Sequence, residues 1–301
     1  MLPAQLKDYS FKVDSVLNLM TLQEKVGQMI QYSNNKLLTG PALDSSNRTE
    51  EIKRGEVGSV FNIITVERAK QYQDLAMQSR LRIPLLFGLD VLHGLKTIFP
   101  IPLAEAASFD LDLMRKTASV AAAETSSLGI HWTFAPMVDI SRDARWGRSM
   151  EGAGEDTWYG SQVAKARIEG FQGSNYDEKR TVLACAKHFA AYGAAVGGRD
   201  YAEVDISGHT LLQVYLPPFR AAVEAGVATF MNAFNEINGI PATAHKVLQR
   251  DLLKGEWGFK GFVVSDWGSV GEIAKHRMAK DNKDAGRLAT IAGCDMDMHS
   301  M

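Results

Sequence analysis

The sequence lacks several features that would place it in common functional classes. Only two of its 301 residues are cysteines, Cys185 and Cys294, and it has no Cys-x-x-Cys or His-Glu-x-x-His motif, which argues against zinc. It has neither the Gly-x-Gly-x-x-Gly loop of dinucleotide-binding folds nor the Gly-x-Ser-x-Gly elbow of serine hydrolases. We therefore expect no bound metal and no cofactor. Both cysteines lie in apolar segments, which predicts buried, unpaired thiols.

Charge and hydrophobicity exclude two further classes. The chain carries 33 basic and 35 acidic residues, a net charge of -2, so it has no basic excess for binding nucleic acid or anionic lipid. No apolar run approaches the roughly 18 residues of a membrane span. Residues 1–10 are polar and do not resemble a signal peptide. We expect either a cytoplasmic protein or an exported one whose leader lies outside this sequence.

Strand-like and helix-like segments alternate along the chain. A capping box at Thr21 and Glu24 marks the start of a helix. Continuous apolar strands that alternate with helices predict an α/β fold with a parallel sheet, and the length suits a (β/α)8 TIM-like barrel with an irregular or missing first strand. A doubly wound open sheet is the alternative, but the glycine-rich loop it normally carries is absent. The predicted strands are 57–63, 83–90, 130–140, 181–189, 228–234, 261–266 and 294–298, and the predicted helices after the first are 66–82, 111–128, 158–172, 211–225, 246–254 and 283–292.

Polar residues gather where these strands end. Because the carboxyl ends of parallel strands meet on one rim, we expect these side chains to converge there. A polyhydroxyl ligand fits them, since carboxylates accept from hydroxyls, cations donate, and tryptophan packs on the apolar face of a sugar. The residues are Asp90, His93, Asp139, Arg142 to Arg148, Lys187, His188, Met231, Asn232, Asp266, Trp267, Asp295 and Asp297.

Each of these residues also has a purely structural interpretation. An isolated histidine such as His188 is more often a core residue than a functional one, and Met231 is more often core than ligand contact. Arg145 and Arg148 can pair with acids of their own loop, which runs from 141 to 158. A weak site for a hard cation at Asp295 and Asp297 is a further alternative.

Five segments resemble glycoside hydrolase family 3, and in particular its bacterial periplasmic β-glucosidases. They are FGLDVLHG (87–94), APMVDISRDARWGR (135–148), EGAGED (151–156), KHFAAYG (187–193) and GFVVSDWG (261–268). The resemblance implies a retaining, exo-acting β-glycosidase, most simply a β-glucosidase acting on terminal β-D-glucosyl residues of β-glucosides or short gluco-oligosaccharides. It also implies a periplasmic or extracellular location.

The same resemblance assigns roles to individual residues. Asp266 matches the catalytic nucleophile, which forms a covalent intermediate with the sugar. Asp90, Arg148, Lys187 and His188 match residues that bind the hydroxyls of the terminal sugar. Met231 lines that subsite, and Trp267 packs against the next sugar.

The sequence departs from the family pattern in two ways. Phe234 stands where many members have a tyrosine whose hydroxyl steadies the nucleophile. The acid/base glutamate of most members lies in a second α/β domain, and the histidine loop of the glucosaminidase branch is also missing at 190–195. We therefore expect residues 1–301 to be one barrel domain of a longer enzyme that needs its C-terminal domain for acid catalysis. β-Xylosidase or glucosaminide specificity, a sugar-binding barrel with little turnover, and a structural barrel with a dead site are the alternatives.

Overall fold

The computed structural model describes residues 9–34, 48–174 and 179–300. Within these ranges, eight parallel strands form two sheets, in the orders β10-β1-β2-β3-β4 and β5-β6-β9. The strands are β1 (Ile30–Ser33), β2 (Ser59–Phe61), β3 (Leu86–Leu89), β4 (Trp132–Thr133), β5 (Cys185–Phe189), β6 (Thr229–Asn232), β9 (Phe262–Val264) and β10 (Asp297–Met298). A separate antiparallel hairpin pairs β7 (Glu236–Ile237) with β8 (Ile240–Pro241).

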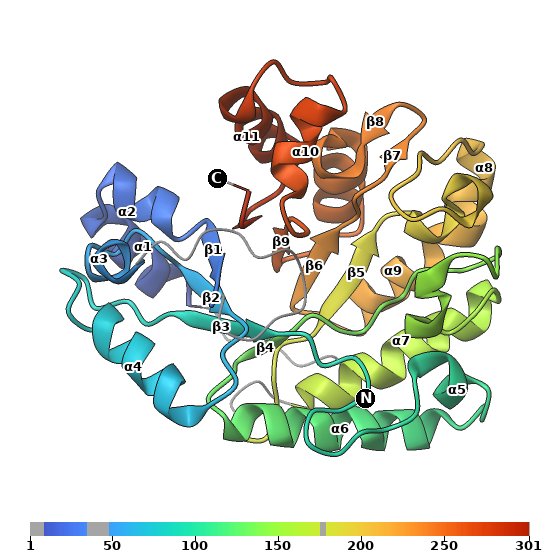
Figure 1. Ribbon diagram of the computed structural model, residues 1–301, viewed down its shortest axis with the longest axis horizontal. Coiled ribbons are helices and arrows are strands. Elements are labelled where there is room, and N and C mark those ends of the chain that lie inside the picture. Colours follow the sequence, from blue (N-terminus) through green and yellow to red (C-terminus); the bar gives the residue numbers. More distant parts are fainter. Residues whose placement is uncertain (1–8, 35–47, 175–178, 301) are drawn as a thin grey trace.

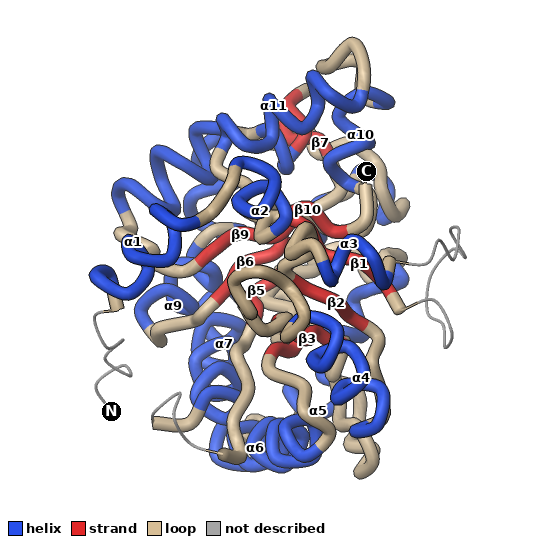
Figure 2. The backbone as a smooth tube through the Cα atoms, turned by 90° about the vertical axis from the view of Figure 1, so that its left-hand side faces the viewer, coloured by secondary structure: helices blue, strands red, loops and turns tan. Residues whose placement is uncertain are grey.

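Helices surround the strands. Figure 1 shows the strands at the centre with α4, α6, α7 and α9 outside them, and Figure 2 shows the same enclosure from the side. The helices are α1 (Ser10–Leu19), α2 (Leu22–Gly27), α3 (Thr49–Lys53), α4 (Val66–Ala76), α5 (Pro102–Ala106), α6 (Leu111–Ser127), α7 (Thr157–Gln172), α8 (Gly208–Thr210), α9 (Pro217–Glu224), α10 (Ser269–Lys275) and α11 (Asn282–Ala292). None of these described helices has the length and apolarity to cross a membrane.

The prediction of an α/β fold with parallel strands is confirmed, but a closed barrel is not observed. Between the described strands of the two sheets, single bridges replace continuous ladders: Trp132 pairs with Leu183 at one seam, and Val264 with Met296 at the other. The hydrogen-bonded strands are also shorter than predicted. The segment 130–140, predicted as strand and loop, pairs regularly only at β4, and the chain beyond Thr133 follows its neighbour through isolated contacts such as the Met137–Lys187 bridge.

Local sequence signals explain most helix starts. Thr21 and Glu24 form the predicted capping box at α2. Asp110, Asp156 and Asp281 each accept a main-chain N–H in the first turn of the helix that follows, which satisfies a donor that the helix itself leaves free.

Three predicted elements were wrong in detail. The predicted helix 211–225 is a π-helical turn (η4, Leu211–Tyr215) followed by α9, which begins at Pro217 because proline has no N–H to continue the earlier turn. The predicted helix 246–254 is the π-helix η6 (Val247–Glu256). The predicted helix 66–82 ends at Ala76.

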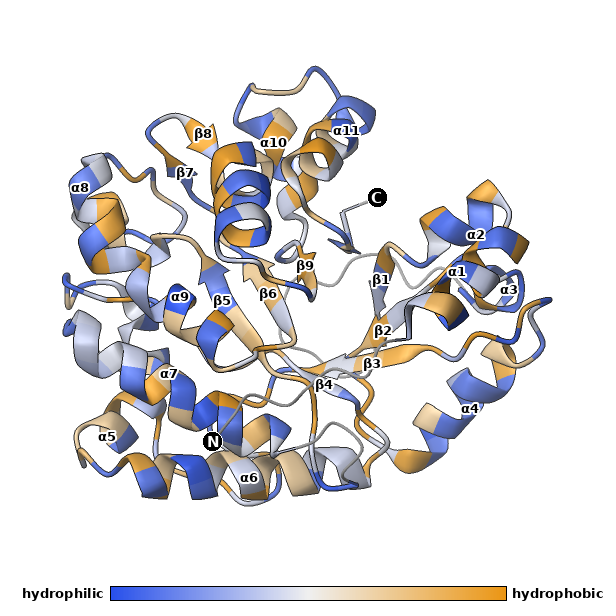
Figure 3. Cartoon of the chain, turned by 180° about the vertical axis from the view of Figure 1, so that it is seen from behind, coloured by the Kyte–Doolittle hydropathy of each residue, from blue (hydrophilic) through white to orange (hydrophobic). Residues whose placement is uncertain are grey.

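The interior is mostly apolar, and several of its buried polar residues lie where strands end. Figure 3 colours β3, β6 and β9 mostly hydrophobic, whereas β5 carries a hydrophilic segment. This segment is Lys187 and His188, both buried within a strand whose every residue is buried. The thiols of Cys185 and Cys294 are buried and free, as predicted.

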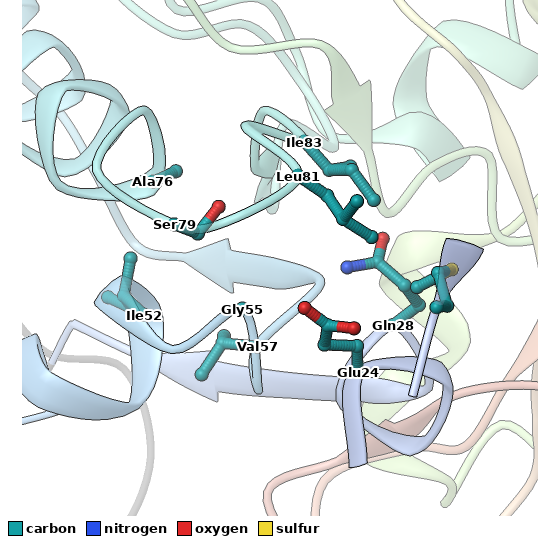
Figure 4. Close-up of a pocket in the computed structure, with 10 residues that line it drawn as sticks. Glu24, Gln28, Ile52, Gly55, Val57, Ala76, Ser79, Leu81 and Ile83 are labelled. Carbon is teal, nitrogen blue, oxygen red and sulfur yellow. The ribbon is translucent and has the colours of Figure 1, made fainter. Parts of the chain in front are cut away.

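A small cavity of about 10 Å³ lies at the opposite end of the sheet from these polar residues. It is lined by residues that precede β2 and β3, among them Val57 and Ile83, and by Glu24 (Figure 4). Glu24 binds Arg80 through both carboxylate oxygens, at 3.1 and 2.6 Å, and these hydrogen bonds lower its pKa to about 2. The cavity has room for about one water molecule and is too small for a sugar.

A buried ion pair holds the loop after β3 against α7. Arg167 on α7 donates to Glu105 on α5 at 2.6 Å and also to the carbonyl of Leu92. Both charged side chains are at most 5 % exposed. Because Leu92 lies two residues beyond Asp90, this pair fixes the segment that carries the first of the predicted sugar-binding residues.

We expect Arg167→Met to lower the free energy of unfolding by about 3–5 kcal/mol, because it leaves Glu105 buried without a counter-charge. Lys165→Met on the same helix is the matched control, since Lys165 pairs with Glu224 at the surface and such pairs contribute about 1 kcal/mol or less. Urea unfolding of both variants checks this. Equal losses in the two variants would contradict it.

Candidate active site

The structure brings most of the predicted site residues to the carboxyl ends of neighbouring strands. Asp90 follows β3, Lys187 and His188 lie within β5, Met231 lies in β6, and Asp266 follows β9 by two residues. These strands are neighbours in the two sheets or across a seam. The backbone topology therefore places on one rim side chains that are far apart in the sequence.

Asp266 has one occupied and one unoccupied carboxylate oxygen. Its Oδ1 accepts the main-chain N–H of Trp267 at 2.6 Å. Its Oδ2 is buried, has no hydrogen-bond partner, and lies 3.6 Å from Nε2 of His188, which is too long for a hydrogen bond. Burial raises the pKa of Asp266 to about 6, even though the charges of Lys187 and Arg148 oppose the rise. The group is therefore mostly ionised at neutral pH, with one oxygen free to react.

Two cations near Asp266 are each held by an acid. Lys187 Nζ is 2.9 Å from Asp90 Oδ1, and the lysine side chain is 4 % exposed whereas that of Asp90 is 44 % exposed. Arg148 binds Glu151 through two parallel hydrogen bonds of 2.7 and 2.9 Å. Burial opposes the charge of Arg148, but Glu151 outweighs it and raises the pKa of the guanidinium. Arg148 thus keeps its charge beside the carboxylate.

The ring of His188 lies between two acids. Its Nδ1 is 2.9 Å from Oδ2 of Asp139, and its Nε2 faces Asp266. The side chain is fully buried, and this burial, with the charges of Arg148 and Lys187, lowers the pKa of His188 well below its ordinary value. His188 is therefore neutral at physiological pH.

Aromatic and apolar side chains form one wall of this region. The Trp267 ring contacts Phe61 and His299, with a centroid distance of 5.2 Å in each case. Met231 is buried in the apolar cluster against which Trp267 packs. Phe234 packs against the rings of Tyr192 and Tyr201, so an aromatic cluster occupies the position where a tyrosine hydroxyl is expected.

Other polar residues predicted on the rim have structural partners instead. Asp295 precedes β10 and binds Lys254 and the main-chain N–H of Val263. Asp297 accepts from Ser265 and from the main chain of Ser300. Both acids of the pair considered for a hard cation thus have protein partners, and no group of three or more potential metal ligands occurs among the described residues. Arg145 pairs with Asp143 in its own loop.

The structure adds two residues whose roles the sequence did not indicate. Glu151 fixes the Arg148 guanidinium, and Tyr192 lies beneath that guanidinium at 5.6 Å and against the His188 ring. The pairing of Arg148 with Glu151 was considered only as an alternative to a functional role. Their spacing of three residues was the available signal for Glu151, whereas nothing in the sequence indicated Tyr192.

The chain is similar to several known proteins. The chain is 45 % identical over 287 residues to a periplasmic beta-glucosidase of Salmonella typhimurium, covering 95 % of this chain and 37 % of that protein. It is 37 % identical over 274 residues to a beta-xylosidase of Formosa agariphila, covering 85 % of this chain and 38 % of that protein. The structure of a Listeria innocua beta-glucosidase in complex with glucose superposes with a TM-score of 0.88 at 41 % identity, over 96 % of this chain and 42 % of that one.

The chain thus spans about 40 % of the length of these relatives. Residues 21–301 match the profile of the glycosyl hydrolase family 3 N terminal domain. Together with the identities above, this match shows that the chain belongs to glycosyl hydrolase family 3.

Proposed function

We propose that this chain carries the nucleophile and the terminal-sugar site of a retaining, exo-acting β-glucosidase. The observation that carries the proposal is the Oδ2 atom of Asp266. This oxygen is buried, makes no hydrogen bond, and belongs to a carboxylate close to two paired cations. Most buried polar side-chain atoms in proteins have a hydrogen-bond partner, and a nucleophile needs one oxygen free to attack.

The proposed chemistry forms a bond between Asp266 and the sugar. Oδ2 attacks the anomeric carbon as the bond from that carbon to the glycosidic oxygen breaks, and the departing oxygen takes a proton from an acid. Water then gives a proton to the conjugate base of that acid and attacks the anomeric carbon, which breaks the bond to Oδ2 and returns the carboxylate, so the configuration is retained. The N–H of Trp267 holds Oδ1, which fixes the direction in which Oδ2 points.

The neighbouring residues suit the terminal sugar. Half-exposed Asp90 accepts from hydroxyls, and Lys187, held against it, donates to them. Arg148 and His188 bind further hydroxyls in this proposal. Met231 lines the subsite, and Trp267 packs against the next sugar along the chain.

The remaining parts of the enzyme are also proposed. We take the two parallel sheets as the halves of one (β/α)8 barrel, joined at their single-bridge seams. The proton donor comes from a second α/β domain, in keeping with the share of the relatives that this chain spans. Glucose is the favoured sugar, and the identity with a beta-xylosidase makes xylose the alternative. The similarity to a periplasmic enzyme supports a periplasmic or extracellular location.

Covalent labelling tests the nucleophile. A 2-fluoro β-glucoside with a dinitrophenyl leaving group needs no proton donor, because the phenolate leaves as a stable anion. We expect it to add one fluoroglucosyl group to this chain, with peptide mass spectrometry placing the adduct on Asp266. Asp266→Asn should abolish labelling. Asp297→Asn, which changes another buried acid of raised pKa, should label like the parent protein. An adduct on any other residue would remove the assignment.

The pH dependence of labelling tests the electrostatics. Only the ionised carboxylate attacks, so the labelling rate should fall as the pH drops through about 6, the pKa of Asp266, to about a tenth of its plateau near pH 5. Lys187→Met removes a charge that lowers this pKa, so its midpoint should move to higher pH, whatever the loss in maximal rate. Lys165→Met, at the surface of α7, should leave the midpoint unchanged. A shift to lower pH in Lys187→Met would contradict this interpretation.

A further inference from the structure

Asp139 is a buried acid that the proposed chemistry does not use. It lies in the segment after β4, which runs beside β5 and is tied to it by a hydrogen bond of 2.8 Å from the Val138 N–H to the Lys187 carbonyl. Its side chain is 1 % exposed. Burial raises the pKa of Asp139 to about 7, although the main-chain N–H of His188 acts in the opposite direction. Burying an ionisable carboxyl group costs folding free energy unless the group is paired or hydrogen-bonded.

A single oxygen of Asp139 makes two contacts with the same residue. Oδ2 accepts the main-chain N–H of His188 at 2.8 Å and lies 2.9 Å from Nδ1 of its ring. The other oxygen, Oδ1, makes no hydrogen bond of normal geometry. Oδ2 of the ionised carboxylate accepts the main-chain N–H and presents its other lone pair to the ring. The hydrogen between Oδ2 and Nδ1 therefore belongs to the imidazole.

A neutral imidazole carries one proton, so this contact decides the character of both ring nitrogens. With the proton on Nδ1, Nε2 is an acceptor. It faces Oδ2 of Asp266 at 3.6 Å, and neither atom has a hydrogen-bond partner. In the other tautomer, a proton on Nε2 would point at Asp266 across a distance too long for a hydrogen bond, and two acceptors would meet at Asp139.

We propose that Asp139 is a positioning residue that fixes neutral His188 with its proton on Nδ1 and its Nε2 as an acceptor beside the nucleophile. This inference deepens the proposed function and rests on it for its consequence for catalysis. Asp139 has no contact with substrate in this scheme. It acts through His188, in the way that a carboxylate behind a functional histidine sets its tautomer and orientation.

The arrangement also restricts what binds between His188 and Asp266. Two buried acceptors that face one another are satisfied only by a donor. A sugar hydroxyl supplies such a donor. A carboxylate or sulfate group at the same position of the sugar ring would instead add a third acceptor. The site should therefore prefer a neutral sugar with a free hydroxyl at that position over an acidic or deoxygenated one.

The tautomer can be measured without any substrate. Ring-nitrogen NMR of the full chain labelled with ¹⁵N-histidine, with His188→Gln used to assign the resonances, should show His188 protonated at Nδ1 and unprotonated at Nε2 at neutral pH. Protonation at Nε2, or at both nitrogens, would overturn the proposal, and this measurement needs no variant at Asp139.

Asp139→Asn tests the cause. The amide removes the negative charge and can turn its NH₂ group toward the ring, so the Nε2-protonated form should become populated, and labelling of Asp266 should slow by about 10- to 100-fold. Glu105→Gln is the matched control, because it changes a buried acid that holds Arg167 rather than His188. It should keep the tautomer of the parent protein even where it lowers stability to urea.

The two proposals fail in distinguishable ways. If the parent chain is not labelled but Asp139→Asn changes the tautomer of His188, the nucleophile assignment fails and the positioning role stands. If labelling occurs and the tautomer of His188 is the same in Asp139→Asn as in the parent, the positioning role is overturned.

Discussion

The two cations beside Asp266 are largely held out of water, and each has a carboxylate within hydrogen-bonding distance. Lys187 has Asp90, and Arg148 has Glu151 through two parallel bonds. Without these acids, both cations would lie next to Asp266 without a carboxylate bonded to them, and a buried charge left unpaired is costly. The pairs therefore let two cations stand beside Asp266 and restrain the rise of its pKa.

Asp266 itself has no cation within hydrogen-bonding distance in the part of the chain that the structure describes. Every ionic partner around it is already engaged elsewhere, so its carboxylate is stabilised by nearby charge rather than by a direct salt bridge. A direct bridge would hold the group ionised more firmly, but it would also occupy the oxygen that reacts in the proposed mechanism. The observed compromise is a carboxylate of moderately raised pKa with one free oxygen, which suits a nucleophile better than a structural acid.

The sequence predicted the parts of the fold that depend on local patterns. The capping box at Thr21, the apolar strands, and the polar residues that follow them were found because each signal lies within a few residues. β1 was missed because Met29 and Ile30 continue the helical spacing that begins at Val26, although the chain turns into a strand at Ile30. The short ladder at β4 and the π-helical turns depend on packing against distant segments, which local propensity does not encode.

Contacts between distant residues limited the prediction of the site in the same way. Asp139 and His188 are 49 positions apart, and only the register between the segment after β4 and β5 brings them together. The strand-end rule placed both on the rim without indicating that one binds the other. It also placed Asp295 there, where the structure shows a salt bridge to Lys254 instead. Position at a strand end thus identified candidate site residues, and the partner that each one contacts in the structure distinguishes them.

Trp267 has two roles in the proposed site, because its main-chain N–H binds Oδ1 of Asp266 and its side chain packs against the next sugar. The residue proposed to recognise the leaving group is the same residue whose amide aims the attacking oxygen. A change at position 267 that shifts the main chain would therefore alter both the contact with the aglycone and the direction of the carboxylate. Enzymes engineered from this scaffold to accept bulkier acceptors would have to change the ring while leaving that peptide plane undisturbed.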